Sequence, residues 1–438
     1  MGSLQLYQLL RFTTFLIISI LFTKSHLSAA DIGIFEVFLF IAGFVSFFWV
    51  TGIIQSFLSL IHNNKSFNKR EEKPGEKMPE IFNAFIVLTG FSLLVLFIGL
   101  ALRNNFYVYD VGGNSLYINL LLAYIFLSNP PVLIEYIYLA RNKPLSILAY
   151  GFISYGIQLV IVVLPVLLGY DMIWALYGLV GISFFRFIWM LILLFKYAEF
   201  KFSPSFIKEH LTLATPLIIS ALLSGSAQYI DGIVITRALD VERFAIFRYG
   251  AKEFPLVIIL ANGLSNAMIS EVGKTGNLKR SMDTIRHQSR RLMHFLFPIS
   301  ILVMMFSRWF YPVIFNEEFI RSADVFMMYI LLIIPRLVFP QTLLIGLKKT
   351  KILLTASVIE LILNVLLSIY LVQYYGTVGV ALATVIVYII EKGFLIGYNY
   401  FKLKIRPTLY IPIKTFLIYT VLIILMFVLI DRRIIDIH

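Results

Sequence analysis

The chain has 438 residues, of which 60% are hydrophobic and only 14% are charged, and it contains no cysteine. A globular domain carries about a quarter charged residues, so this composition excludes an ordinary soluble protein. Apolar runs of about 20 residues recur along the whole length, long enough to cross a bilayer as helices. The lack of cysteine excludes disulfide bonds and thiol catalysis.

In chain order, the apolar runs predict thirteen membrane-spanning helices. The connecting loops are short, which leaves no room for a soluble domain. The predicted spans are 6–23, 33–61, 80–102, 116–139, 146–168, 171–195, 210–236, 244–271, 292–314, 323–346, 352–372, 378–401 and 409–430.

The net charge of +13 is unevenly distributed over this topology. Loops after even-numbered spans hold 22 lysines and arginines, whereas loops after odd-numbered spans and the C-terminal tail hold seven. The positive-inside rule therefore places the N-terminus in the cytoplasm and the C-terminus in the periplasm, and no nucleic-acid partner is needed to explain the charge. The basic amphipathic stretch 278–295 is expected to be a loop, lying on the inner leaflet or simply solvated.

Two parts of the chain resemble each other at a nearly constant offset. "YIFLSNPP" (124–131) matches "YILLIIPR" (329–336) at an offset of 205 residues, and "LSAADIGIF" (27–35) matches "LDVERFAIF" (239–247) at an offset of 212. The pattern predicts an all-α polytopic membrane protein with two pseudo-symmetric six-helix bundles and one peripheral C-terminal transmembrane helix. The expected divisions are an N-terminal lobe at 1–195, a cytoplasmic linker at 196–209, a C-terminal lobe at 210–401, and the extra helix with an outer tail at 402–438.

The stretch "FRYGAKEFP" (247–255) places three charged residues in span eight. An ionisable residue at bilayer depth costs roughly 2.5–3.5 kcal/mol, so a function is expected for it. Arg248 and Lys252 are four residues apart and would share one face of a continuous helix. Two interpretations stay open. Lys252, Glu253 and Asp231 form a structural ion cluster, or the cations bind an anionic head group while the acids balance charge or take a coupling ion.

Arg336 follows Pro335 near the middle of span ten, and Pro340 lies one turn further on. Proline interrupts a helix and frees a backbone carbonyl, so this guanidinium either binds a ligand or caps the freed carbonyl. A structural role is favoured for the secondary candidates inside the spans, which are Arg186, Lys392, Glu391 and Glu360.

The repeat and two segments, "YIDGIVITRALDVERFAIFRYGAKEFP" (229–255) and "YILLIIPRLVFPQTLLIGLKKTK" (329–351), resemble the polysaccharide (O-antigen-type) flippases. These belong to the multidrug/oligosaccharidyl-lipid/polysaccharide exporter superfamily, and the resemblance covers about residues 6–401. It implies a transporter that moves polyprenyl-diphosphate-linked oligosaccharide from the cytoplasmic to the periplasmic leaflet of a bacterial inner membrane. Two lobes would alternate access around a cationic lumen that receives the diphosphate.

Carried over residue by residue, the resemblance places five residues in that lumen: Arg11, Glu36, Asp231, Arg248 and Lys252. Arg336 joins the cationic set because of its depth. Asp231, Glu253 and Glu36 become candidates for ion coupling or charge balance. The chain departs from the family pattern in a first span about ten residues shorter than its counterpart and in the odd number of spans.

The implied partners are the polyprenyl-diphosphate-linked glycan, membrane lipids, a polysaccharide polymerase and a chain-length regulator. No Walker A sequence or zinc-binding histidine pattern occurs, so neither an enzyme nor a cofactor or metal is expected. A diphosphate carries about two negative charges, and each gains about 2.3 kcal/mol per 100 mV on moving outward, so outward flipping needs no ATP.

Two other functions stay open at this point. A cation-coupled multidrug antiporter of the same superfamily would want acids to dominate its cavity, which the cations Arg248, Lys252 and Arg336 oppose. An integral-membrane polysaccharide polymerase or ligase would need catalytic groups on a sizeable outer loop, and the outer loops here are short.

Overall fold

The computed structural model describes residues 3–63, 77–102, 115–274 and 278–432. Within these ranges every regular element is a helix, and the only β pairing is an isolated bridge between Met78 and Ala198. The predicted outer tail after residue 432 and most of the predicted loop 62–79 lie outside the described residues. The all-α membrane fold is confirmed.

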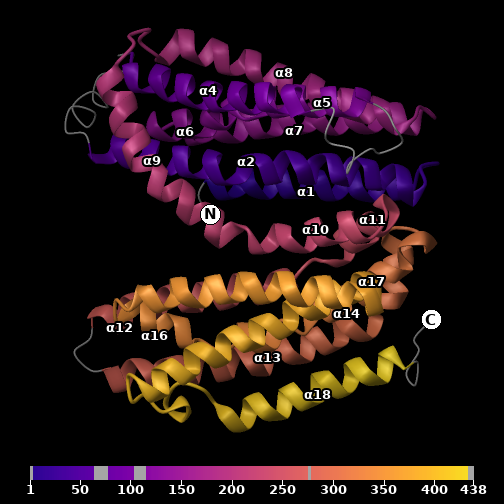
Figure 1. Cartoon of the computed structure of the whole chain (residues 1–438), viewed down its shortest axis with the longest axis vertical. Coiled ribbons are helices and arrows are strands. Elements are labelled where there is room, and N and C mark those ends of the chain that lie inside the picture. The colour runs from indigo at the N-terminus through magenta and orange to yellow at the C-terminus, as the bar shows by residue number, and fades with distance from the viewer. Residues whose placement is uncertain (1–2, 64–76, 103–114, 275–277, 433–438) are drawn as a thin grey trace. The chain divides into compact units, whose positions relative to one another are not determined.

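The chain separates into two compact units, Met1–Ser226 and Ala227–His438. The N-terminal unit is a bundle of long helices (Figure 1). Its elements are α1 (Ser3–Thr23), α2 (Ala29–Asn63), α4 (Pro79–Leu102), α5 (Ser115–Ser128), η3 (Pro130–Val132), α6 (Leu133–Ala140), α7 (Pro144–Leu167), α8 (Met172–Tyr197) and α9 (Pro204–Gly225).

The C-terminal unit combines several short helices with the two long helices α13 and α17 (Figure 1). Its elements are α10 (Ala227–Ala238), α11 (Val241–Gly250), α12 (Pro255–Lys274), α13 (Leu278–Ile314), η4 (Glu317–Phe319), α14 (Ile320–Ile330), α15 (Ile333–Arg336), α16 (Pro340–Gly346), α17 (Thr350–Phe401), η5 (Pro407–Leu409) and α18 (Ile413–Asp431).

The order of these helices follows the predicted six, six and one spans, although fewer of them are long single helices. In the described ranges ten helices are long and apolar enough to cross a membrane, or eleven if the pair bent by 48° before α16 counts as one span. Predicted spans seven and eight are each divided into two shorter helices. Spans eleven and twelve are the two arms of α17, which kinks at Gly376, a residue with φ 56° and ψ −133°.

The prediction of a continuous helix over 244–271 is wrong. Helix α11 ends at Gly250, and α12 begins only at Pro255. Pro255 has no backbone N–H to donate and disfavours helical geometry in the residue before it, which accounts for the break. Arg248 therefore lies in the last turn of α11, whereas Lys252 lies beyond the end of that helix, so the two do not share a helical face as predicted.

The division between the units also differs from the predicted linker at 196–209. Helix α9 packs closely on α2 inside the first unit, where a Cβ added at Gly52 would lie 2.6 Å from the backbone nitrogen of Ile218. His210 on α9 makes a 3.0 Å hydrogen bond to the carbonyl oxygen of Ile53 on α2. These contacts place the first helix of the predicted C-terminal lobe with the N-terminal unit.

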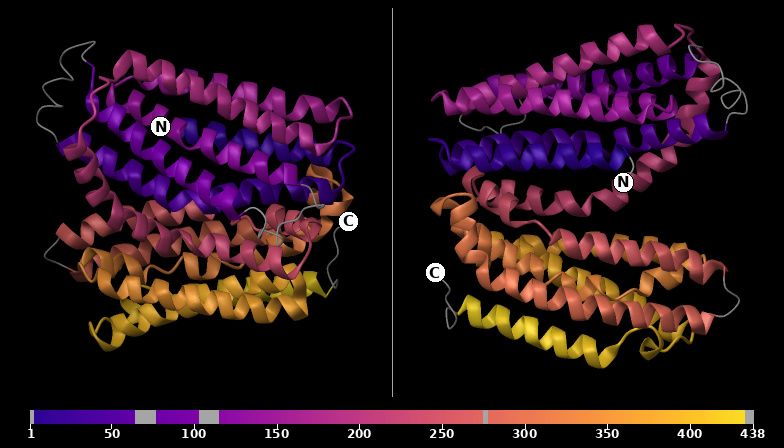
Figure 2. Two further views of the ribbon diagram at one scale, coloured as in Figure 1. Left: turned by 45° about the horizontal axis from the view of Figure 1, so that its top comes forward. Right: turned by 180° about the vertical axis from the view of Figure 1, so that it is seen from behind.

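Helix α18 packs at the edge of its unit, as expected of a peripheral span (Figure 2). The Tyr419 hydroxyl lies 2.9 Å from Nδ1 of His294 on α13, and the Tyr419 ring stacks on Phe297 at 5.2 Å. Only Ile423 and Ile430 of this helix are buried. Large apolar side chains such as Leu417, Ile418 and Val421 are exposed, as on a helix bordered by lipid.

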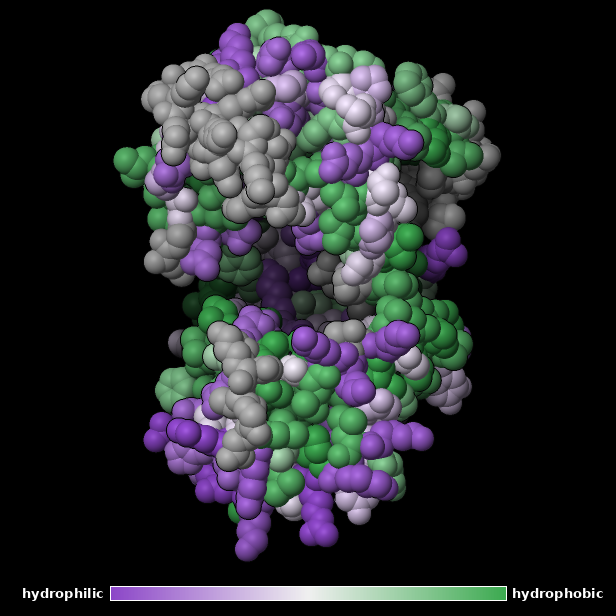
Figure 3. Space-filling view, turned by 90° about the vertical axis from the view of Figure 1, so that its left-hand side faces the viewer, coloured by the Kyte–Doolittle hydropathy of each residue, from purple (hydrophilic) through white to green (hydrophobic). Residues whose placement is uncertain are grey.

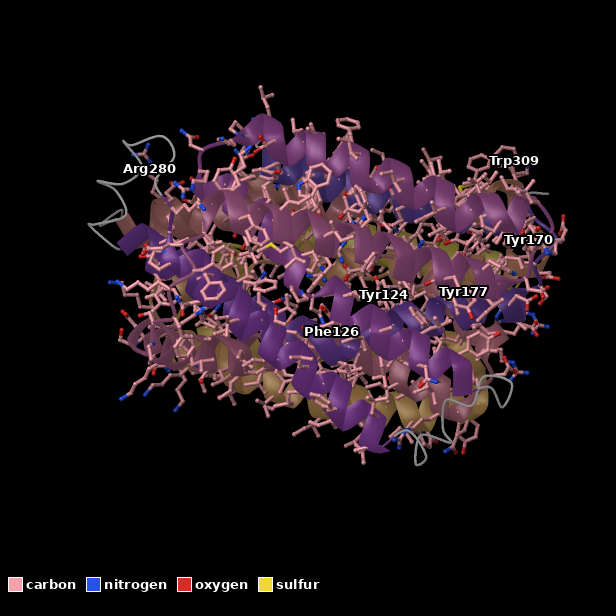
Figure 4. The ribbon with its side chains drawn as sticks, turned by 90° about the horizontal axis from the view of Figure 1, so that it is seen from above. Tyr124, Phe126, Tyr170, Tyr177, Arg280 and Trp309 are labelled. Atoms are coloured by element: carbon pink, nitrogen blue, oxygen red, sulfur yellow. The ribbon has the colours of Figure 1, made fainter. Side chains whose placement is uncertain are left out.

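The stretch 278–295, predicted as a loop, is the first half of the long helix α13. Its apolar residues Met282 and Ile285 are buried in the unit, while Lys279 and Arg280 stay exposed. Hydrophilic side chains gather at this end of the C-terminal unit (Figure 3). Arg280 and Trp309 lie toward opposite ends of α13 (Figure 4).

Candidate functional site

A buried polar network surrounds Asp231 in the C-terminal unit. Asp231 is 5% exposed on α10, and its Oδ2 accepts hydrogen bonds from the Tyr329 hydroxyl of α14 at 2.8 Å and from the Thr384 hydroxyl of α17 at 2.7 Å. Asn364 donates to Oγ1 of Thr384 at 3.3 Å, and Ser368 donates to Oδ1 of Asn364 at 3.1 Å. The network joins three helices through one carboxylate.

One oxygen of that carboxylate is left over. Oδ1 of Asp231 is buried and has no hydrogen-bond partner among the described residues. A buried oxygen without a donor is costly, so the group suits a small positively charged partner. Asp231 was a predicted candidate for ion coupling, and its hydroxyl and amide neighbours supply further oxygen atoms for such a partner.

Arg336, the deep cation predicted beside a helix break, is engaged by an acid. Its guanidinium donates two hydrogen bonds to the carboxylate of Glu253, at 2.6 and 2.8 Å, and lies 5.0 Å from the centre of the Tyr388 ring. The predicted break is present, since α15 ends at Arg336 and α16 begins at Pro340. Glu253 thus pairs with Arg336 from the segment between α11 and α12, instead of joining Lys252 and Asp231 in the predicted ion cluster.

Three further charged residues lie on the two arms of α17. Lys392 and Glu391 pair at 3.0 Å, and their side chains are 12% and 13% exposed. Glu360 interacts electrostatically with this pair and with Arg336. The arrangement fits the structural role favoured for these residues.

The remaining cations of span eight lie beside the break. Arg248 is exposed in the last turn of α11. Lys252 is half-buried, with its ammonium 5.3 Å from the centre of the Tyr249 ring. Tyr249 itself is fixed by stacking on Phe319 at 4.7 Å. The break therefore leaves two cations near one end of α11, and the ammonium of Lys252 lies over an aromatic ring there.

In the N-terminal unit, Arg11 and Arg186 belong to one polar cluster. Arg186 on α8 donates to Oε1 of Gln158 on α7 at 2.7 Å and lies 4.8 Å from the centre of the Tyr155 ring. Arg11, exposed on α1, interacts electrostatically with Tyr155 and with Glu135 of α6. Glu36, which the resemblance placed in the lumen, is buried on α2 and 7% exposed.

Glu135 is a buried acid that sequence reasoning missed. It lies inside predicted span four, so the rule that flags ionisable residues at bilayer depth would have found it. Tyr7, also missed, is buried on α1 and accepts a hydrogen bond from the Tyr155 hydroxyl at 3.2 Å. No linear pattern connects these two residues, because helix packing alone brings them together.

The two polar clusters occupy corresponding positions of the repeat. Tyr124 and Tyr329 are 205 residues apart; Tyr329 donates to Asp231, and Tyr124 interacts electrostatically with Arg11 and Arg186. Gln158 and Asn364 are 206 residues apart, and each donates or accepts within its cluster. The two units therefore share the positions of an amide and a hydroxyl group. They differ in the charged residues beside these groups, which are arginines in the N-terminal unit and Asp231 in the C-terminal unit.

A family model described as "Lipid II flippase MurJ" matches residues 66–432 of the chain. A solved structure of lipid II flippase MurJ in an inward closed conformation has a TM-score of 0.66 at 18% identity, over 98% of this chain and 92% of that one. An inward-facing multidrug resistance MATE family transporter of the MOP superfamily has a TM-score of 0.61 at 14% identity, over 97% and 96%. No curated protein matches the chain.

These structural likenesses show the fold, which is that of the MOP-superfamily transporters. The superfamily and the lipid-linked flippase class inferred from the sequence are supported, whereas the O-antigen-type family is not confirmed, and nothing favours a polymerase. The family match and the apolar helices indicate a multi-pass transporter of the inner membrane. Because the family model covers most of its length, the chain belongs to the MurJ lipid II flippase family.

Proposed function

We propose that the protein flips a polyprenyl-diphosphate-linked saccharide from the cytoplasmic to the periplasmic leaflet by alternating access. The observation that carries this proposal is the match to the lipid II flippase family over residues 66–432. Lipid II is the first candidate substrate on that ground. A repeat unit of a surface polysaccharide is the second, because of the segments around 229–255 and 329–351 that resemble O-antigen-type flippases.

The cations of each unit support an anionic head group. Arg11 is exposed on α1, and Arg248 is exposed on α11 beside the half-buried Lys252. Arginine binds phosphate oxygens in a bidentate manner, which suits a diphosphate. We assign Arg336 a structural role and not a head-group contact, because Glu253 already accepts two hydrogen bonds from its guanidinium. A cationic drug would be repelled by these arginines, which argues against multidrug efflux.

The membrane potential favours the outward step. With the N-terminus in the cytoplasm, a diphosphate of about two negative charges moving outward gains about 2.3 kcal/mol per charge for each 100 mV. The emptied protein must then reset with its cations unneutralised. Asp231 is our candidate for taking up a coupling cation at that stage, because its carboxylate is buried and one oxygen has no donor.

The test is transport in vesicles that contain the purified protein. Lipid II or a lipid-linked repeat unit is placed in the membrane, and an impermeant glycan-modifying reagent measures its exposure on the opposite leaflet. We expect an inside-negative potential to accelerate the exposure of one of these lipids. Arg248→Ala should slow it at least tenfold, whereas Arg243→Ala, an exposed cation on the same helix, should leave it unchanged.

Movement of neither lipid, together with uptake of a cationic drug, would overturn the proposal. Equal rates for Arg248→Ala and Arg243→Ala would remove Arg248 from the binding site while leaving the flippase assignment in place.

A further inference from the structure

Glu135 lies where a carboxylate is costly and no function has yet been given to it. It is in the first turn of α6, directly after the break made by Pro130 and Pro131, and it is 7% exposed inside the apolar stretch Tyr117–Ala140. A buried ionisable residue in a membrane helix is expected to be paired and functional.

The surroundings of Glu135 are unusually rich in groups that stabilise a negative charge. Tyr7 and Arg11 of α1 and Arg186 of α8 all interact electrostatically with it. The Tyr7 hydroxyl in turn accepts a hydrogen bond from Tyr155 of α7. The cluster therefore contains one acid, Glu135, and two arginines, Arg11 and Arg186. Its net charge is +1 when Glu135 is ionised and +2 when Glu135 is protonated.

The cluster also holds donors that the described residues do not use. Nε of Arg186 and Nε2 of Gln158 are buried without a hydrogen-bond partner in the described ranges, and Gln158 is fully buried. Buried N–H groups are nearly always satisfied in native structures, by protein, water or ligand. Two unused donors beside two arginines indicate that the cluster binds a negatively charged acceptor, such as a phosphate or carboxylate oxygen.

We propose that this cluster is an anion subsite in which Glu135 acts as a proton-dependent competitor, so that an anionic head group and a proton are taken up together by the N-terminal unit. The proposal rests on the proposed function for the identity of the anion, the diphosphate of the lipid-linked substrate. Arg11, the exposed member of the cluster, is the first contact, and the buried donors of Arg186 and Gln158 would bind the anion next.

Glu135 is the one carboxyl group of this cluster, so it is the member whose charge a proton can change. The titratable and charged groups that face it are Tyr7 and Arg11 of α1, Tyr150 and Tyr155 of α7, Arg186 of α8 and Tyr136 of its own helix. Arginine stays protonated and tyrosine stays neutral at physiological pH. The charge offered to an anion is thus set by the proton on one carboxyl group.

The sign of the coupling follows from the charges. A bound anion adds negative charge near Glu135, which favours the protonated carboxyl, and by reciprocity a protonated Glu135 favours the bound anion. The affinity should rise as the pH falls, by at most about tenfold per pH unit for one linked proton. In a cell, a head group that leaves the cluster would release the proton with it.

The experiment measures binding of a short-chain prenyl-diphosphate monosaccharide to the purified full-length protein in detergent across the neutral pH range. Both phosphates of this probe are esterified, so its own charge is constant there. We expect the wild-type Kd to fall several-fold per pH unit of acidification. Glu135→Gln, which keeps the size of the side chain and can still accept from Tyr7, should bind at every pH with the acidic wild-type affinity.

Two controls keep the result interpretable. Glu199→Gln removes an exposed acid of the same unit and should keep the wild-type pH dependence. Size-exclusion profiles and thermal stability of each variant show whether it is folded, and Tyr7→Phe, which removes only one donor, serves if Glu135→Gln does not fold. With Tyr7→Phe we expect the pH dependence to shift to higher pH without being lost.

The proposal is overturned if wild-type binding is independent of pH, or if Glu135→Gln keeps the wild-type dependence. Flipping of the lipid-linked substrate in vesicles with no effect of pH on binding would reject the subsite alone. Binding with the expected pH dependence but no flipping would reject the proposed function and retain the subsite.

Discussion

Arg336 and Glu253 are held together by two short hydrogen bonds in a part of the chain that is otherwise apolar. Their side chains are 24% and 19% exposed, so neither charge has full access to water. Removing one partner of such a pair leaves the other charge uncompensated, whereas removing both charges costs much less. The pair joins α15 to the segment ahead of α12, two places where the backbone is not continuously helical.

Arg336→Ala should therefore lower the free energy of unfolding by about 3–5 kcal/mol because it strands Glu253. The double variant Arg336→Gln with Glu253→Gln should lose clearly less than the sum of its two single variants. Thermal unfolding in detergent compares the wild type, the two single glutamine variants and the double variant as a double-mutant cycle, and Arg336→Ala is measured beside them. Additive losses would show that the two side chains are not energetically coupled, and the structural role of Arg336 would then be wrong.

Asp231 offers a different prediction, because its neighbours are neutral. Oxygen atoms from Asp231, Thr384 and Asn364 lie close together, and a hard alkali cation prefers such donors. We expect sodium, exchanged for choline at constant ionic strength, to stabilise the wild-type protein, by about 2.7 kcal/mol at a concentration one hundred times Kd. Asp231→Asn should lose this response, and Asp171→Asn, an exposed acid, should keep it. An identical response in both variants would rule out Asp231 as the cation ligand.

At the scale of the elements, the break between α11 and α12 determines where the charges of span eight lie. Gly250 ends α11 in close contact with α14, where an added Cβ would lie 2.7 Å from Cβ of Val325 and closer still to the Ser322 carbonyl oxygen. The Ser322 hydroxyl donates to the Ile246 carbonyl oxygen at 2.7 Å, which fixes the two helices together. A side chain at position 250 would push them apart.

Gly250→Ala is expected to destabilise the protein by about 1–3 kcal/mol, the usual cost of overpacking a close contact. Gly263→Ala is the matched control, since Gly263 lies in α12 with nothing within 4 Å of an added Cβ, and alanine should be neutral or slightly stabilising there. Unfolding temperatures in detergent compare the two. Equal stability of both variants would mean that α11 and α14 can separate without cost.

At the scale of the whole molecule, two units built on one repeat present different charges. The N-terminal unit places Arg186 beside its buried amide Gln158, and the C-terminal unit places Asp231 within reach of its counterpart Asn364. Two repeat units with unlike charges allow one unit to receive an anion and the other a cation. A flippase driven outward by the membrane potential and reset by binding a cation would require both sites.

The proposed orientation can be tested cleanly, because the chain has no cysteine of its own. Single cysteines are introduced at Asp171, where spans five and six meet, at Glu317 after span nine, and at Lys402 after span twelve; all three are exposed. A membrane-impermeant maleimide added to intact spheroplasts should label the first two and leave the third unlabelled until the membrane is opened. The reverse pattern would contradict the positive-inside assignment.

Hydropathy and repetition determined the class of this protein, since burying about twenty apolar residues in a bilayer requires a helix whatever its neighbours are. The same reasoning found the kink at Arg336 and the peripheral last helix. It wrongly predicted a continuous helix across 251–254, although Pro255 follows directly. It also overlooked Glu135, although a lone acid in a predicted span can be recognised from the sequence.

The partners of the charges were decided by tertiary structure alone. Arg336 is 83 residues from Glu253, and Asp231 is 153 residues from Thr384. Hydropathy gives the depth of a side chain but not the direction in which its helix faces, and a shift of one residue turns a helix by about 100°. Only the packing of helices against one another fixes that direction, and with it which acid meets which base.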